Sequence, residues 1–205
     1  MGVSKLHPTE TLVEAFHAGL TLFGENRVQE FDSKRESLAG LRPSPEVHLI
    51  GHLQSNKSAR AAEIFAAVES VDSLRLAERL SDAAAKLGKT LPILLEIKLS
   101  PEPTKAGLDP QSTDLPSLLD RIPDLRHLAL RGLMTIAPLD ESLDAARVCF
   151  RQLRVLREAL ARQHPRLDFP ELSMGMSGDF EIAIEEGSTL VRIGTALFGE
   201  RRRAG

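Results

Sequence analysis

A lysine close to the amino terminus, Lys5, stands at the end of the first apolar segment of the chain. A lysine that is partly withdrawn from water loses some of its preference for the charged ammonium form. The neutral amine can attack an aldehyde and form a Schiff base. Lys5 is therefore a candidate for covalent binding of a carbonyl compound, although its position alone also allows an ordinary exposed lysine.

Two segments rich in small residues near the carboxyl terminus could bind a phosphate. The first, Ser173–Asp179, precedes a helical pattern, and Ser177 is placed to cap that helix. The second contains Gly194 and Thr195 and opens the last helical turn. Helix starts offer unpaired N–H groups and a positive dipole end, and a glycine lets the backbone approach a ligand closely. Two ordinary capped turns are the alternative.

Three further residues are candidates for charged or metal-binding roles. Arg192 lies near the end of the last apolar segment, and its guanidinium would face a bound ligand if it points inward. A salt-bridged structural arginine is the alternative. His48 and His52 are four residues apart, but they lie on either side of a strand end and a glycine. A zinc pair would need that spacing on a helix, together with a third ligand. We expect no metal site.

The elements that would position these residues alternate between short apolar segments and helical patterns, which is typical of parallel βα units. The clearest helix is predicted at Ser142–Arg162, where apolar residues recur every three or four positions. Strands are predicted at Gly2–Lys5, Leu20–Phe23, Val47–Ile50, Ala67–Val71, Ile93–Leu99, Leu130–Ile136, Leu172–Met174 and Leu190–Ile193. Eight such units predict an α/β protein with a single TIM-type (β/α)8 barrel, with an open doubly wound sheet as the alternative. In a barrel the active site lies at the carboxyl ends of the strands.

The length and composition of the chain exclude several classes of protein. The 205 residues suit one domain spanning residues 1–205, and the net charge of −3 does not fit a nucleic-acid-binding surface. A single cysteine, Cys149, excludes an intrachain disulfide. With no signal peptide and no apolar segment of membrane length, we expect a cytoplasmic protein without a membrane partner. The absence of tyrosine excludes any mechanism that needs a tyrosine of this chain.

Six stretches, found in family order over nearly the whole chain, resemble the YggS/PROSC family of pyridoxal phosphate homeostasis proteins. Their combination is highly specific, although no single one would be. They are Val3-Ser4-Lys5, Phe23-Gly24-Glu25-Asn26-Arg27-Val28-Gln29-Glu30, Ile50-Gly51-His52-Leu53-Gln54-Ser55-Asn56-Lys57, Arg131-Gly132-Leu133-Met134, Leu172-Ser173-Met174-Gly175-Met176-Ser177 and Val191-Arg192-Ile193-Gly194-Thr195-Ala196-Leu197-Phe198-Gly199.

The resemblance implies the type III fold of pyridoxal 5′-phosphate (PLP) proteins, a barrel like the N-terminal domain of alanine racemase. It also implies that Lys5 holds PLP as a Schiff base. The other matching positions are Asn26 and Met134 near the cofactor, Ser177, Gly194 and Thr195 around the phosphate, and Arg192 facing the pyridine nitrogen. Family members usually carry a helix before the first strand, so we expect this N-terminal helix to be missing. Lys98 stands where asparagine is common in the family, and it would add a positive charge at the barrel mouth if it points inward.

The implied function is PLP binding without catalytic turnover. An arginine is always charged in practice, so beside the pyridine nitrogen it keeps that nitrogen unprotonated and makes PLP a poorer electron sink. We therefore expect a protein of intracellular PLP homeostasis, a monomer or weak dimer, that passes PLP to apo-enzymes requiring it. The alternatives are a slow type III PLP-dependent amino-acid racemase, an aldolase with Lys5 as a substrate Schiff base, and a barrel that only binds partners.

Overall fold

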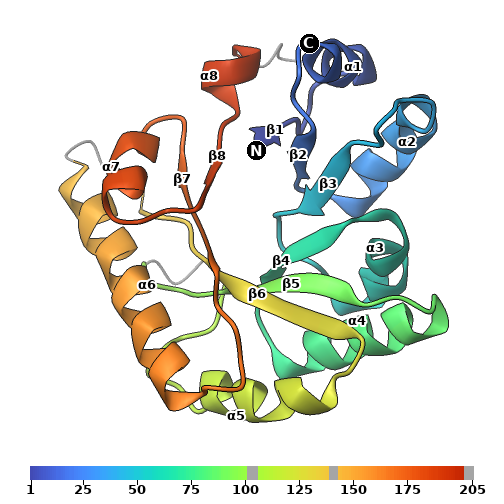
Figure 1. Ribbon diagram of the computed structural model, residues 1–205. Coiled ribbons are helices and arrows are strands. Elements are labelled where there is room, and N and C mark those ends of the chain that lie inside the picture. The colour runs from blue at the N-terminus through green and yellow to red at the C-terminus, as the bar shows by residue number, and fades with distance from the viewer. Residues whose placement is uncertain (101–105, 139–142, 201–205) are drawn as a thin grey trace.

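The computed structural model describes residues 1–100, 106–138 and 143–200 (Figure 1). Eight parallel strands form one sheet in chain order from β1 to β8. Their bounds are β1 Gly2–Val3, β2 Leu22–Glu25, β3 Glu46–Leu49, β4 Ala67–Val71, β5 Leu91–Glu96, β6 Leu128–Met134, β7 Glu171–Met176 and β8 Leu190–Arg192.

The sheet closes on itself where the two ends of the chain meet. Gly2 and Ile193 form a parallel bridge, and the Val3 N–H donates to the Ile193 carbonyl at 2.8 Å. In return, the Ile193 N–H donates to the Met1 carbonyl at 3.0 Å. The predicted TIM-type barrel is therefore confirmed, and the open doubly wound sheet is wrong.

The helices lie around the outside of the strand ring (Figure 1). They are α1 Thr9–His17, α2 Val28–Leu38, α3 Ser58–Ile64, α4 Leu74–Lys86, α5 Asp114–Arg121, α6 Asp144–Gln163, α7 Phe180–Glu185 and α8 Thr195–Phe198, with short 3-10 helices at Ser55–Lys57 and Ile122–Asp124. In the described part of the chain, no helix combines the length and apolar character that crossing a membrane would need.

The helix predicted at Ser142–Arg162 shows how the apolar pattern sets the packing. It is observed as α6, whereas Ser142 lies outside the described residues. Cys149, Phe150 and Leu153 of α6 are buried against the barrel, so one stripe of the helix supplies the contact. The Cys149 thiol is thus a packed core group.

All eight predicted strands are found; β4 has the predicted bounds, and the other seven have shifted ends. The strand predicted at Leu20–Phe23 runs instead from Leu22 to Glu25. The apolar pattern stops before Glu25, but that carboxylate is fully buried and paired with Lys34 at 2.9 Å, so the strand continues through it. The hydrophobic pattern therefore could not predict the end of this strand, because the strand ends on a charged residue that an ion pair keeps buried.

Candidate functional site

A cleft of about 210 Å³ opens where the carboxyl ends of β1, β7 and β8 meet. We call it the mouth cleft. Six of the seven residues singled out in the sequence line it: Lys5, Asn26, Ser177, Arg192, Gly194 and Thr195. Sequence reasoning missed the other lining residues, Val3, Ile50, Ile136, Met176 and Gly178, which supply apolar walls and a small-residue turn.

Met134 and Lys98 lie outside this lining. Met134 is fully buried in β6, where its register partners are Glu96 and Ser173 on the neighbouring strands. Lys98 follows β5 and lines a separate groove against α6. The structure therefore does not bring these two side chains to the mouth cleft.

Lys5 is placed by a tight turn directly after β1. The His7 N–H donates to the Ser4 carbonyl at 3.1 Å, so Lys5 and Leu6 are the two central residues of the turn. Leu6 has a φ of 64°, which fits the third position of a type II turn, normally taken by glycine. The turn carries the Lys5 side chain to the cleft as the chain leaves the barrel wall.

Asn26 is positioned by close packing between the loops after β2 and β3. A Cβ atom at Gly51 would come within 2.4 Å of the Asn26 carbonyl oxygen and within 2.8 Å of its Cα atom. Only glycine allows this approach. The Asn26 amide oxygen Oδ1 is buried and has no partner in the described part of the structure, so a ligand in the cleft would meet an unsatisfied polar group.

Ser177 joins the two small-residue turns. Its Oγ accepts the N–H groups of Gly194 and Ala196, both at 3.2 Å, at the start of α8. The prediction that Ser177 caps the helix after β7 is wrong. The residue before α7 is instead Asp179. Its carboxylate accepts the Met176 N–H, and the resulting turn directs Ser177 toward the residues that follow β8. We call Ser177, Gly194 and Thr195 the phosphate cup, after the phosphate that the sequence predicts there.

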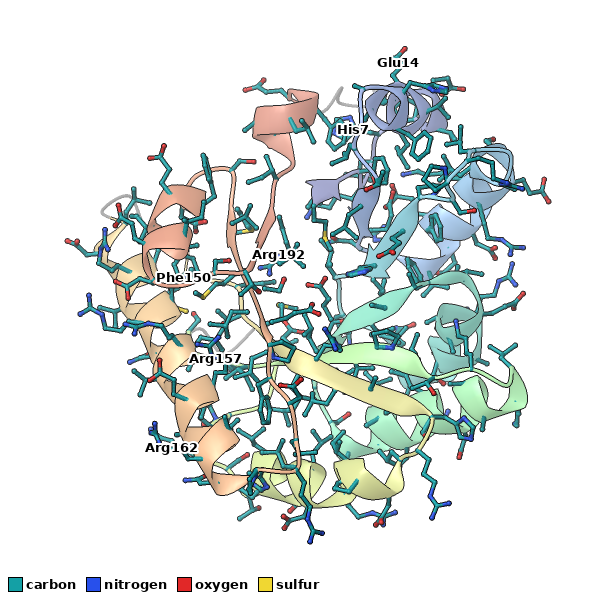
Figure 2. All side chains as sticks on the ribbon, viewed as in Figure 1. His7, Glu14, Phe150, Arg157, Arg162 and Arg192 are labelled. Carbon is teal, nitrogen blue, oxygen red and sulfur yellow. The ribbon has the colours of Figure 1, made fainter. Side chains whose placement is uncertain are left out.

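Arg192 points inward and is almost completely buried, with 4% of its surface exposed (Figure 2). Its two terminal nitrogens donate to the Ser173 hydroxyl at 2.7 Å and to the Thr135 carbonyl at 2.8 Å. Burial lowers the pKa of Arg192, and the charges of Glu69, Glu96 and Asp179 oppose that shift. Within the described ranges no carboxylate lies at ion-pair distance from Arg192, so the competing salt-bridge interpretation does not hold.

A chain of polar groups inside the barrel fixes the Arg192 guanidinium. The Ser173 hydroxyl donates to the fully buried carboxylate of Glu69, which is also paired with His48 Nδ1 at 2.7 Å. Sequence reasoning did not single out Glu69, although it is a charged residue inside a fully buried strand, and it gave Ser173 no role of its own. His52 instead pairs with Asp72 at 3.1 Å. The two histidines thus have separate partners, and the described residues contain no metal-binding group of three or more.

Glu96, at the end of β5, is a further buried acid of the barrel strands, besides Glu25 and Glu69. Burial, reinforced by the nearby charge of Asp72, raises the pKa of Glu96 to about 7, against the opposing charges of Arg192 and His52. Glu96 is therefore poised between its neutral and charged forms at physiological pH.

Comparison with known proteins adds to this geometry. Residues 1–202 match the family model described as "Alanine racemase, N-terminal domain". The chain is 43% identical over 202 residues to the pyridoxal phosphate homeostasis protein of Aquifex aeolicus (strain VF5), covering 98% of this chain and 86% of that protein. It is 42% identical over 203 residues to the protein of that name from Escherichia coli (strain K12), covering 98% and 85%.

Solved structures of other proteins have the same fold as this chain. PipY of Synechococcus elongatus PCC7942, solved with PLP bound, superimposes with a TM-score of 0.91 at 45% identity, over 97% of this chain and 91% of that one. Alanine racemase from Clostridium difficile 630 shares the fold, with a TM-score of 0.79 at 16% identity over 97% of this chain and 51% of that one. The chain therefore belongs to the family of pyridoxal phosphate homeostasis proteins, which has the fold of the alanine racemase N-terminal domain.

Proposed function

We propose that this chain holds PLP covalently through Lys5 in the mouth cleft and takes part in PLP homeostasis. The observation that carries the proposal is the convergence of an amine, an amide, a phosphate cup and a buried guanidinium on one cleft. The names of the relatives and the PLP bound to PipY support it.

The residues of the mouth cleft fit such a cofactor. The unpartnered Asn26 Oδ1 needs a polar group from a ligand. The phosphate cup places Ser177 and Thr195, two hydroxyl side chains, on the cleft at the start of α8. Beyond its two chain neighbours, no atom of the described residues lies within 4 Å of the place where a Cβ at Gly178 would be. Apolar side chains such as Ile136 and Val3 can contact an aromatic ring between these polar ends.

When bound, PLP supplies an aldehyde that condenses with an amine to a C=N bond, its oxygen leaving as water with the two amine hydrogens. Lys5 provides that amine in its neutral form. Ser177 accepts two N–H groups and keeps its own O–H as a donor toward a phosphate oxygen. Arg192, held by Ser173 and Thr135, would present a fixed positive charge to the pyridine nitrogen.

The same arrangement supports binding without turnover. A guanidinium is a donor without an acceptor, so Arg192 cannot stabilise a protonated pyridine nitrogen as a carboxylate would. None of the 205 residues is a tyrosine that could serve as an opposing base. We infer that the bound PLP is passed on to apo-enzymes that require it.

Visible absorption and cofactor transfer test this function. The purified protein with PLP is expected to be yellow, and Lys5→Ala to lose the band. The control Lys86→Ala, an exposed lysine of α4, is expected to keep it. Excess PLP-requiring apo-enzyme is expected to withdraw the PLP. Retention of PLP by the chain would contradict the homeostasis role, and racemisation of amino acids that is lost in Lys5→Ala would establish the racemase instead.

A further inference from the structure

The turn that carries Lys5 adopts a costly backbone conformation. Leu6 has its φ of 64° in the left-handed region, which is unfavourable for a residue that carries a Cβ atom. Packing of the Leu6 side chain does not offset this cost, because 62% of its surface is exposed. Something other than hydrophobic burial must hold the turn in place.

Polar side chains of α2 and β2 form hydrogen bonds with Ser4 and Leu6, the residues on either side of Lys5. The Leu6 N–H donates to the Glu30 carboxylate oxygen Oε1 at 2.5 Å. On the other side, Lys34 Nζ donates to the Ser4 carbonyl at 3.2 Å, and the Ser4 hydroxyl donates to Glu25 Oε1 at 2.8 Å. Lys5 itself is the one residue between these two held positions.

One buried ammonium connects the two sides. Lys34 Nζ lies 2.9 Å from Glu25 Oε1 and 2.8 Å from Glu30 Oε1, and its side chain is 8% exposed. Burial raises the pKa of Glu30, but the hydrogen bonds from Lys34 and from the Leu6 N–H outweigh this, so the pKa lies below its usual value. Glu30 is therefore charged at neutral pH, and charge-assisted hydrogen bonds are the stronger kind.

We propose that Glu25, Glu30 and Lys34 form a positioning clamp that holds the Lys5 turn in the geometry required for covalent capture of PLP. The clamp acts on the backbone on each side of Lys5, and none of its three residues lines the mouth cleft. This inference rests on the proposed function. In it the clamp supports only the covalent attachment of PLP to Lys5, whereas the phosphate cup binds the phosphate.

The test compares PLP with pyridoxine 5′-phosphate, which has the same phosphate and ring but no aldehyde. Glu30→Ala removes the Leu6 N–H bond while the Lys34–Glu25 pair remains. We expect PLP affinity to fall by about tenfold, the worth of one charged hydrogen bond, with pyridoxine 5′-phosphate affinity unchanged within about twofold. Glu30→Gln keeps an acceptor for the Leu6 N–H and should restore most of the PLP affinity. Glu36→Ala, an exposed change on the same helix, is the matched control.

Three outcomes overturn the clamp. They are unchanged PLP affinity in Glu30→Ala, equal loss of both ligands, and failure of Glu30→Gln to recover. Lys34→Met provides a second variant with the same expected split between the two ligands, and thermal unfolding shows that each variant is folded. Failure of the proposed function itself looks different, because the unaltered protein would then form no covalent bond to PLP at Lys5.

Discussion

Buried charges distinguish the mouth of this barrel from its apolar wall. Arg192 donates to the neutral oxygens of Ser173 and Thr135. The Ser173 hydroxyl in turn donates to the carboxylate of Glu69. Such a cation keeps its charge because hydrogen bonds replace the lost water. The two hydrogen bonds leave the Arg192 guanidinium fixed in orientation.

Glu96 gives the molecule a specific pH dependence. Its carboxyl ionises near 4.5 in the unfolded chain and near 7 in the folded one, because burial and Asp72 disfavour its charge. Between these values only the unfolded chain loses the proton, so this group lowers the free energy of unfolding as pH rises. Glu96→Gln stays neutral, and its stability relative to the unaltered protein should rise by up to about 3 kcal/mol from pH 4.5 to pH 8.

Chemical denaturation at several pH values measures this difference. Asp82→Asn, at an exposed position of α4, serves as the control and should show no comparable trend. A stability difference between Glu96→Gln and the unaltered protein that is constant with pH would show that Glu96 is ionised normally.

Gly51 is expected to control the position of Asn26. A methyl group at this position would overlap the Asn26 backbone, so Gly51→Ala should push the Asn26 loop away from the cleft. Overpacking of this kind costs about 1–3 kcal/mol of stability. PLP titration should show weaker binding. Gly40→Ala, which has open space around it, is the control; unchanged PLP affinity in Gly51→Ala would mean that Asn26 does not contact the ligand.

At the scale of elements, the phosphate cup depends on contact between two turns. Ser177→Ala removes the acceptor for the Gly194 and Ala196 N–H groups and loosens the start of α8 from the loop after β7. We expect PLP and pyridoxine 5′-phosphate to lose affinity together, each by about tenfold. Calorimetric titration of both ligands, with the exposed Ser37→Ala as control, checks this. Loss of PLP affinity alone would contradict the assignment of Ser177 to the phosphate.

The order of elements could be predicted from sequence because each strand is a short apolar segment followed by a helical stripe. β4 lies at the predicted residues, and α6, at Asp144–Gln163, covers nearly all of the predicted range. The positions of Lys5, Ser177 and Arg192 at strand ends then follow from the barrel topology.

Residues that act through contacts distant in sequence could not be found in this way. Ser177 was assigned to the nearest helix, whereas its partners lie 17 and 19 residues further along the chain. Nothing in the residues next to Lys34 indicates burial, but its ammonium pairs with the buried carboxylate of Glu25 in the interior. Local patterns reveal which residues are polar, and only the folded chain shows which polar residues meet.

The whole molecule is closed by the seam between β1 and β8, and the mouth cleft spans that seam. Lys5 follows β1 on one side of the seam, and Gly194 and Thr195 of the phosphate cup follow β8 on the other side. PLP bound to both should therefore oppose opening of the barrel. At a free PLP concentration 100-fold above its Kd, linkage predicts about 2.7 kcal/mol of stabilisation and a Tm increase of about 5–10 °C.

A thermal shift assay with PLP tests this seam effect. Lys5→Ala should show a much smaller increase in Tm at the same PLP concentration, because only the cup side remains attached. An equal Tm increase in both proteins would mean that PLP does not bridge the seam through Lys5.

The covalent attachment of PLP to Lys5 is tested most directly by borohydride reduction of the PLP-loaded protein, followed by peptide mapping of the modified residue. Reduction makes the C=N bond permanent, so the attachment site survives digestion. We predict a single pyridoxyl group on the peptide that contains Lys5. A label on another lysine, or no label after reduction of a yellow protein, would contradict the account.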